Sequence, residues 1–268
     1  MKFDKKRIIW LLAILFIITL GVGISFYCTQ VPAVAAQSAV VKLGELAAAV
    51  NGQKVLVFSP HPDDESIGVG GYITQSIKNG AVVTIVLVTD GNAQHEESIR
   101  YAEFKKATAI LGVAESNLIF LGFPDGKLAS EDQTSLQAVL QSQFDKCNPD
   151  IVLYPDTSDY NPDHKTIGQA IERIRKGESN HLTAYEYLIH YELMYPRPRK
   201  FDPELNMLPP KRLNDVDTEW LRFNLSSDVE TSKEKAVFTY KSQLKSPELN
   251  GLMHSFIRKN ELFAIPKS

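Results

Sequence analysis

Short apolar runs alternate with helical stretches through the middle of this chain, and this alternation restricts the folds that it can adopt. Each run has four to seven residues and is rich in Val, Ile and Leu, which is typical of buried strands. Each is followed by a longer segment whose apolar side chains recur at helical spacing. The runs are residues 55–58, 82–88, 118–121 and 151–154, and the helical segments are residues 66–78, 94–111, 131–147 and 165–175. This order predicts a Rossmann-like α/β fold, with a mostly parallel sheet and helices on both faces.

The last third of the chain adds less regular elements to this sheet. An aromatic-rich run at residues 185–192 predicts a strand, and residues 220–225 and 229–244 predict a further strand and a helix. The Pro-rich segment at residues 196–210 is either a surface connection or a loop that flanks the site. The length suffices for one domain with an ample core, which we place at residues 54–268.

Two of the predicted strands are followed by polar runs. Ser-Pro-His-Pro-Asp-Asp-Glu at residues 59–65 follows the first strand, and Asp-Tyr-Asn-Pro-Asp-His at residues 159–164 follows the fourth. Ligands of open α/β sheets bind beyond the carboxyl ends of the strands, so both runs are expected at one site. His61 and Asp64 can face one metal ion, while Asp63 between them stays free to act as a base. An ordinary polar turn is the alternative for the first run, but the second run favours a metal site.

Four motifs carry a resemblance to a known family. They are His-Pro-Asp-Asp-Glu at residues 61–65, Thr-Asp-Gly at residues 89–91, Arg100 with Glu103, and Asn-Pro-Asp-His at residues 161–164. Together they resemble the PIG-L/LmbE-like zinc-dependent de-N-acetylases, over roughly residues 54–243. The resemblance implies an LmbE-like fold. It also implies a zinc-dependent hydrolase that removes an N-acetyl or small N-acyl group from an amino-sugar derivative, such as an N-acetylglucosaminyl glycoside.

The resemblance also implies roles for individual residues. It implies zinc ligands at His61, Asp64 and His164. It implies Asp63 as the general base, which takes a proton from the attacking water and returns it to the leaving amine. Three protein ligands leave one coordination position open, as catalytic zinc sites require. Asp163 is expected to orient a histidine ring or the base. Other divalent metals also suit such a ligand set, so the sequence does not fix the metal.

One residue of the second motif departs from the family pattern. Many members carry a histidine at the position of Asn161, and that histidine helps to stabilise the oxyanion of the tetrahedral intermediate. An amide N–H can still donate a hydrogen bond there, but it cannot carry charge. His190 is either a partly buried histidine or a pocket residue that supplies this charge. Arg100 is either a solvated helical charge or a side chain that points at the site and holds substrate or an acidic loop.

Two other functions are open on these residues. A metal-dependent hydrolase on this fold can cleave an ester or amide of a non-sugar substrate, and release of an alcohol would distinguish ester cleavage. A catalytically weakened glycan-binding protein is the second alternative, and Asn161 motivates it. Because His61, Asp63, Asp64 and His164 are all present, we favour the enzyme.

The N-terminal segment predicts a membrane helix. Residues 1–7 carry four basic side chains, and the largely apolar segment at residues 8–28 has the length of a bilayer span. The basic residues would stay in the cytoplasm, and residues 29–53 would form a spacer before an extracytoplasmic, membrane-anchored catalytic domain. A cleaved signal peptide, and hence a secreted domain, is the alternative.

The charge balance excludes one class of partner. The formal net charge is −3 and the isoelectric point is about 6.1, so the chain offers no basic surface for nucleic acid. The resemblance implies an amino-sugar-containing small molecule or glycan as partner, and the N-terminal helix predicts a membrane as a second one.

Overall fold

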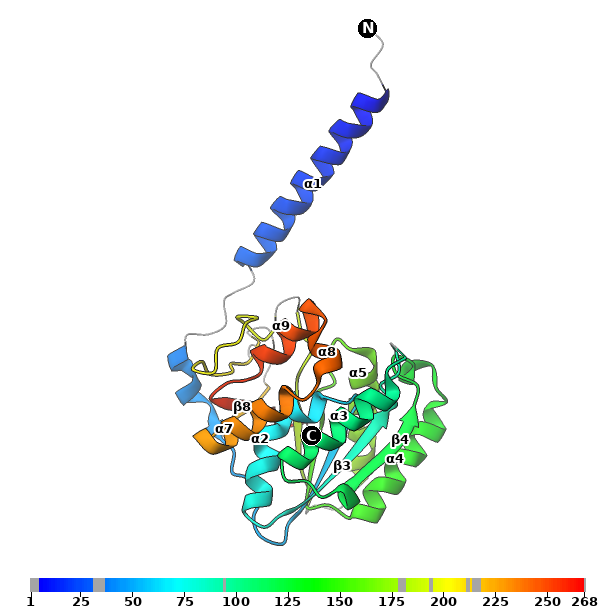
Figure 1. The fold of residues 1–268 in the computed structure, drawn as a ribbon, viewed down its shortest axis with the longest axis vertical. Helices are drawn as coiled ribbons and strands as arrows, with labels where there is room; N and C mark the ends of the chain where they lie inside the picture. Colours follow the sequence, from blue (N-terminus) through cyan, green and yellow to red (C-terminus); the bar gives the residue numbers. More distant parts are fainter. Residues whose placement is uncertain are drawn as a thin grey trace.

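The computed structural model describes residues 5–30, 37–93, 95–177, 182–192, 195–210, 213 and 218–267. In this part of the chain eight strands form one sheet, in the order β1-β7-β8-β6-β5-β2-β3-β4 (Figure 1). All neighbouring strands are parallel except β8, which is antiparallel to both β6 and β7. The strands are β1 (Gly44–Glu45), β2 (Lys54–Ser59), β3 (Val82–Thr89), β4 (Leu118–Phe123), β5 (Ile151–Pro155), β6 (Thr183–Tyr187), β7 (Trp220–Asn224) and β8 (Asn260–Ala264).

Helices cover both faces of the sheet. They are α2 (Asp64–Lys78), α3 (Glu97–Ile110), α4 (Gln133–Cys147), α5 (Pro162–Gly177), α7 (Ser227–Val237), α8 (Lys241–Leu244) and α9 (Pro247–Ser255), with α1 (Lys5–Gln30) outside the sheet. Val55 and Val57 of β2 belong to a core with α2, α3 and α7, whereas Leu56 and Phe58 belong to a core with α4 and α5. The continuous apolar run of β2 therefore supplies both cores, as expected for a parallel sheet buried on both faces.

The sheet order creates a switch point beside β2. The chain passes from β2 to β3 and β4 on one side, and then returns to β5, which pairs with the other side of β2. In such sheets the crevice beyond the carboxyl ends of the two diverging strands binds ligands. The two polar runs follow β2 and β5, so both lie at this crevice.

The α/β fold with a mostly parallel sheet is confirmed, and most predicted elements of the middle region lie within a few residues of the observed ones. The predicted strand at residues 185–192 is too long, because β6 ends at Tyr187. The predicted helix at residues 229–244 is two helices, α7 and α8. The sequence analysis missed β8, which begins with the buried polar pair Asn260 and Glu261 and so lacks an apolar pattern.

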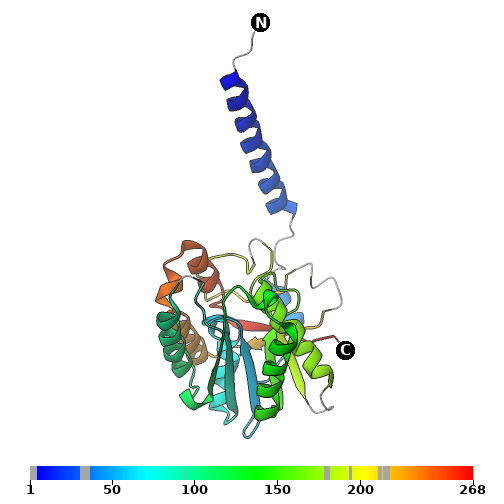
Figure 2. The same ribbon diagram turned by 90° about the vertical axis from the view of Figure 1, so that its right-hand side faces the viewer.

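The N-terminal expectation needs correction. A bilayer span needs about 20 consecutive, predominantly apolar residues in one helix. No helix within the described residues is both long and apolar enough to cross a membrane. This finding overturns the anchor predicted at residues 8–28, and we withdraw the extracytoplasmic location and the membrane partner that rested on it. Both views show α1 apart from the sheet (Figures 1 and 2).

The predicted spacer also differs from what is observed. Residues 29–53 were expected to precede the domain, but Gly44 and Glu45 form β1, which pairs with β7 at the edge of the sheet. Leu46 and Ala49 are buried in the core next to α2 and β3. The folded domain therefore begins before residue 54.

Candidate metal centre and active site

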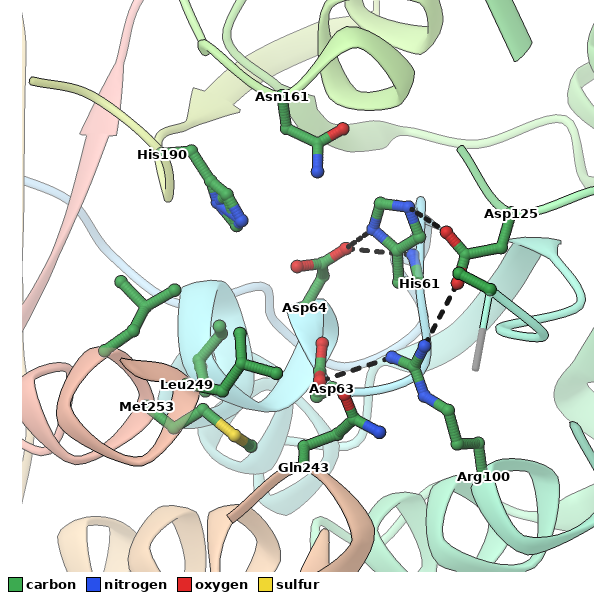
Figure 3. A pocket seen from close by; sticks show the side chains of 13 residues that line it. His61, Asp63, Asp64, Arg100, Asp125, Asn161, His190, Gln243, Leu249 and Met253 are labelled. Atoms are coloured by element: carbon green, nitrogen blue, oxygen red, sulfur yellow. Dashed lines mark hydrogen bonds and ion pairs between the residues drawn. The ribbon is translucent and has the colours of Figure 1, made fainter. Parts of the chain in front are cut away.

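The turn between β2 and α2 places two adjacent carboxylates in different directions. Asp63 has a φ of 129°, a conformation that residues other than glycine rarely adopt and that costs about 1–3 kcal/mol. Its carbonyl oxygen accepts hydrogen bonds from the N–H groups of Ser66 and Ile67, so α2 begins directly after it. Asp64 then faces two histidines, whereas Asp63 faces Arg100 (Figure 3).

Three side-chain atoms form a nearly equilateral triangle. Nδ1 of His61 lies 3.1 Å from Oδ2 of Asp64, Nε2 of His164 lies 3.0 Å from the same oxygen, and the two nitrogens are 3.2 Å apart. A tetrahedral zinc ion with bonds of about 2.0–2.1 Å holds its ligand atoms roughly 3.3 Å apart. Spacing and donor types therefore fit a divalent metal ion with an open fourth position.

Further carboxylates orient the two histidine rings. Oδ2 of Asp159 lies 3.2 Å from Nδ1 of His164, on the side of the ring away from Asp64. Nε2 of His61 lies 3.2 Å from Oδ2 of Asp163 and 3.3 Å from Oδ1 of Asp125. Such carboxylate–histidine pairs fix the ring that faces a metal and strengthen it as a ligand.

These carboxylates give the centre a strong preference for a cation. Burial alone would lower the pKa of both histidines, but Asp125, Asp163 and Asp64 raise the pKa of His61, and Asp64 and Asp159 raise that of His164. Burial opposes ionisation of Asp64, yet the two histidines hold its pKa well below the usual range. The same carboxylates also attract a divalent cation, which must displace the protons from these rings to bind.

Asp63 and Arg100 form a second pair at the same pocket. Arg100 is buried, and its Nη2 donates to the Pro62 carbonyl oxygen at 2.8 Å and to Oδ2 of Asp63 at 3.4 Å. Its Nη1 donates to Oδ2 of Asp125 at 3.1 Å and to the Gly91 carbonyl oxygen at 3.1 Å. Arg100 therefore holds the acidic loops together and is not a solvated helical charge. Burial raises the pKa of Asp63, and the guanidinium counteracts part of this rise.

Asn161 caps the N-terminus of α5 and also lines the pocket. Its Oδ1 accepts from the N–H of Asp163 at 2.9 Å, and the N–H of Lys165 donates to its carbonyl oxygen at 3.0 Å, so it is the N-cap of α5. Pro162 follows at the first helical position, which suits a residue without an N–H. Because the cap requires the amide oxygen, the NH₂ group is the part that points into the pocket (Figure 3).

His190 lies in the loop after β6 and not on a strand, because β6 ends at Tyr187. Its backbone N–H donates to Oδ2 of Asp159 at 3.0 Å, and its ring centre is 4.8 Å from that of His164. Burial and the neighbouring His164 lower its pKa to about 4, so the ring is neutral near pH 7. A neutral His190 lines the pocket but cannot supply the positive charge that the sequence analysis considered for it.

The pocket itself combines these groups with residues from the C-terminal helices. It is a cavity of about 200 Å³, in which Figure 3 shows Asn161 and His190 on one side and Asp63 and Arg100 on the other. Gln243 of α8, three apolar side chains of α9, and Ile67 and Ala93 also line it. Glu103 on α3 holds α8 in place, because its carboxylate accepts from the N–H of Ser242 at 2.9 Å and from its hydroxyl at 2.6 Å.

Most of the predicted site residues lie at this pocket. His61, Asp63, Asp64, Arg100, Asn161 and His190 line it, whereas His164 and Asp163 are buried behind it. Sequence analysis did not select Asp125, Asp159 and Gln243 as site residues. Asp125 follows the strand β4 in a Gly-Phe-Pro-Asp-Gly run, and this position was the available signal for it. Gln243 lies on a short helix, α8, far along the chain from the other site residues.

Comparisons with known proteins find similarity over the region that contains this site. The family model PIG-L, described as GlcNAc-PI de-N-acetylase, matches residues 56–175. This segment runs from β2 through α5 and includes His61, Asp63, Asp64 and His164. The match covers less than half of the chain, so it shows a similarity to the PIG-L family over this segment.

Curated relatives are similar over the same region. The "Probable N-acetyl-alpha-D-glucosaminyl L-malate deacetylase 2" of Bacillus anthracis is 34% identical over 135 residues, which are 45% of this chain and 58% of that protein. The "Diacetylchitobiose deacetylase" of Thermococcus kodakarensis is 33% identical over 128 residues, which are 43% of this chain and 46% of that protein. The chain thus matches about half of the length of these relatives.

A solved structure shares the fold over a larger part of the chain. The crystal structure of a conserved protein from Thermus thermophilus superposes with a TM-score of 0.58 and 23% identity, and it covers 80% of this chain and 95% of its own. At this identity the similarity shows the fold alone.

Proposed function

We propose that this chain is a metal-dependent hydrolase, with zinc as its metal, that removes an N-acetyl or small N-acyl group from an amino-sugar derivative. The observation that carries the proposal is the triangle of His61, Asp64 and His164, two of which line the same pocket as Asp63. The PIG-L match over these residues and the names of the similar deacetylases support it.

His61, Asp64 and His164 would hold the metal. A divalent ion in such a site polarises the amide carbonyl and lowers the pKa of a bound water to about 7. Asp159 and Asp163 keep the two rings in the orientation that ligation needs, because each lies within 3.2 Å of the ring nitrogen that faces away from the metal position.

Asp63 would move the protons of the reaction. It takes one proton from water as the water oxygen bonds to the acyl carbon, and it then gives that proton to the amide nitrogen as the C–N bond breaks. A carboxylic acid and a free amine leave. A base works best when its pKa is near the working pH, and burial raises the pKa of Asp63 in that direction. A cation bound nearby would lower this pKa again, because it favours the carboxylate.

Asn161 would stabilise the negative charge that develops on the acyl oxygen. Its NH₂ group points into the pocket and is held there by the cap on α5, so it is already oriented before substrate binds. The neutral His190 ring on the same side can contribute a second hydrogen bond, since its Nδ1 is buried without a partner among the described residues.

Arg100 would fix the base. Its guanidinium bonds to both Asp63 and Asp125, which lie on loops after different strands. A lysine cannot make this planar set of bonds. Arg100 would thus hold Asp63 in position, and it would also contact substrate, because it lines the pocket wall.

The test is a direct assay of the full chain. Metal-free protein is reloaded with one equivalent of zinc and incubated with a panel of N-acetylglucosaminyl glycosides, and free amine and acetate are both measured. We expect equal amounts of the two products, and loss of both in Asp63→Asn although that variant still binds zinc. Asp228→Asn is the matched control, because this exposed carboxylate on α7 pairs with Lys78 away from the pocket.

The outcomes separate the alternatives. No amine release from any glycoside, with zinc bound and the protein folded, would refute the proposal. Alcohol release from simple esters without amine release from glycosides would point to an esterase. Reloading with iron(II) or manganese in place of zinc tests the metal, and a higher kcat with either would overturn the zinc assignment.

A further inference from the structure

A second, larger cavity opens from the candidate active site. Its volume is about 510 Å³, compared with about 200 Å³ for the pocket at the metal centre. The two cavities share Asn161, His190, Leu249 and Leu252 in their walls, so a molecule in one continues directly into the other. The smaller pocket holds the groups that would act on an N-acyl bond. The larger one is where the remainder of the substrate would lie.

An exposed aromatic ring stands at this second cavity. Tyr160 is 60% exposed, although its backbone N–H donates to the His190 carbonyl oxygen at 2.7 Å and fixes its place in the chain. Its ring lies against that of Tyr191, with ring centres 4.9 Å apart, so the exposed face is held in one orientation. A fixed aromatic face is a suitable platform for the C–H groups of a sugar ring.

Other residues of the same cavity supply polar groups for hydroxyls. Arg199 is held at the cavity by two hydrogen bonds from Nε and Nη2 to the Tyr195 carbonyl oxygen, at 3.1 and 2.8 Å. Glu248, in the first turn of α9, faces the same cavity and acts electrostatically on Arg199. Sugar hydroxyls both donate and accept, so one ring can bond to a guanidinium and a carboxylate together.

The charges of the lining disfavour an acidic group. Among the described residues of the cavity wall there are two carboxylates, from Glu192 and Glu248, and one guanidinium, from Arg199. A carboxylate on the substrate could pair with the guanidinium only while lying near two like charges, which costs free energy in a partly buried site. An uncharged ring carries no such cost.

We propose that this cavity binds a second, uncharged pyranose ring stacked on Tyr160, so that the preferred substrate is a neutral amino-sugar disaccharide or longer saccharide. The inference rests on the proposed deacetylase function and specifies its substrate class. It distinguishes this chain from a deacetylase whose sugar carries an anionic aglycone.

Three probes of different size and charge test this inference with the full chain. They are methyl N-acetylglucosaminide, N,N′-diacetylchitobiose and N-acetylglucosaminyl malate, each assayed for kcat/KM with zinc-loaded protein. We expect the disaccharide to exceed both other probes by about tenfold. In Tyr160→Ala the ratio of disaccharide to monosaccharide kcat/KM should fall about three- to tenfold, mainly through KM, and Tyr160→Phe should restore it.

A control and a binding measurement complete the test. Phe201→Ala removes another exposed ring, which packs on Phe238 and lines neither cavity, and it should leave the ratio unchanged. Calorimetry with Asp63→Asn measures disaccharide binding without turnover, and adding Tyr160→Ala should weaken that binding by a similar factor.

The results distinguish the inference from the proposed function. Equal kcat/KM for disaccharide and monosaccharide, with no effect of Tyr160→Ala on the ratio, would overturn the inference while leaving the deacetylase in place. A preference for the malate glycoside would also overturn it. Tyr160-dependent binding of the disaccharide without any turnover would support the cavity assignment and refute the deacetylase function.

Discussion

Replacing Asn161 by alanine removes two contacts that serve different purposes. The amide oxygen caps α5, because it accepts from the N–H of Asp163 at 2.9 Å. The NH₂ group points into the pocket, where we propose that it stabilises the oxyanion. The variant should therefore lose both stability and activity, and the two losses have separate magnitudes.

The expected magnitudes follow from the two contacts. Loss of an asparagine N-cap costs about 1 kcal/mol of folding free energy. Loss of one oxyanion donor lowers kcat by about 10²–10³-fold, which corresponds to roughly 3–4 kcal/mol of transition-state stabilisation. The loss of transition-state stabilisation should thus exceed the loss of folding free energy.

Asn161→Asp is the matched variant that separates the two contacts. Aspartate caps helices as well as asparagine does, so the free energy of unfolding should stay within about 0.5 kcal/mol of the unmodified protein. Its carboxylate has no N–H to donate, so kcat should fall at least as far as in Asn161→Ala. Asn161→His restores a donor that can carry charge and should recover part of the lost kcat, at the expense of the cap.

The assay combines kcat at saturating zinc with urea unfolding of the same preparations. Zinc content is measured for each variant, so that loss of metal is not mistaken for loss of the donor. If Asn161→Ala keeps kcat within about threefold, or if Asn161→Asp is fully active, Asn161 is not the oxyanion donor.

Three further predictions concern the metal, a buried ion pair and pH. Zinc added to chelator-treated protein should raise its Tm and restore activity, stabilising the fold by about 4 kcal/mol at a thousandfold excess over Kd, and His164→Ala should abolish the shift. Lys233→Met removes the ammonium group that lies 2.7 Å from the buried Glu261 carboxylate, and it should lower the free energy of unfolding in urea by about 3–5 kcal/mol. Lys259→Met, at an exposed ion pair, should lower it by under about 1 kcal/mol. Equal losses in the two variants would contradict the burial argument. Burial, with help from nearby acids, raises the pKa of Glu186 to about 8, so the stability that this residue contributes is complete below pH 4.5 and is lost as pH rises to about 8. Tm should therefore decline less over this pH range in Glu186→Gln than in the unmodified protein. An identical decline would exclude Glu186 as a source of the pH dependence.

Strands were predicted correctly where their burial in the tertiary structure leaves a pattern in the local sequence. The strands β2, β3 and β5 are buried on both faces, so their side chains are mostly apolar and the strands are recognisable from sequence. The strand β8 was not predicted, because it begins with buried polar residues. Its Glu261 is buried because the carboxylate accepts from the N–H groups of Gly71 and Tyr72 at 2.6 and 2.8 Å and pairs with Lys233. Partners so distant in sequence leave no local pattern.

The sequence indicated which candidate ligands come together, but not the contacts that support them. His61, Asp63, Asp64 and His164 stand in short motifs whose spacing carries the chemistry. The guanidinium of Arg100 could have been solvated, and only the folded chain shows it bonded to Asp63 and Asp125. The aromatic-rich run at residues 185–192 also placed His190 on a strand, whereas β6 ends at Tyr187.

The sequence by itself determined the α/β class, the two polar runs at strand ends and the residues able to bind a metal, because each depends on side chains close together in the chain. The tertiary structure decided that β5 lies beside β2, which brings His164 to within 3.2 Å of His61 across a separation of 103 residues. It also decided which end of the Asn161 amide faces the pocket and that a second cavity extends from it. These features depend on strand order and on contacts between distant segments, and hydrophobic periodicity within one segment carries no information about either.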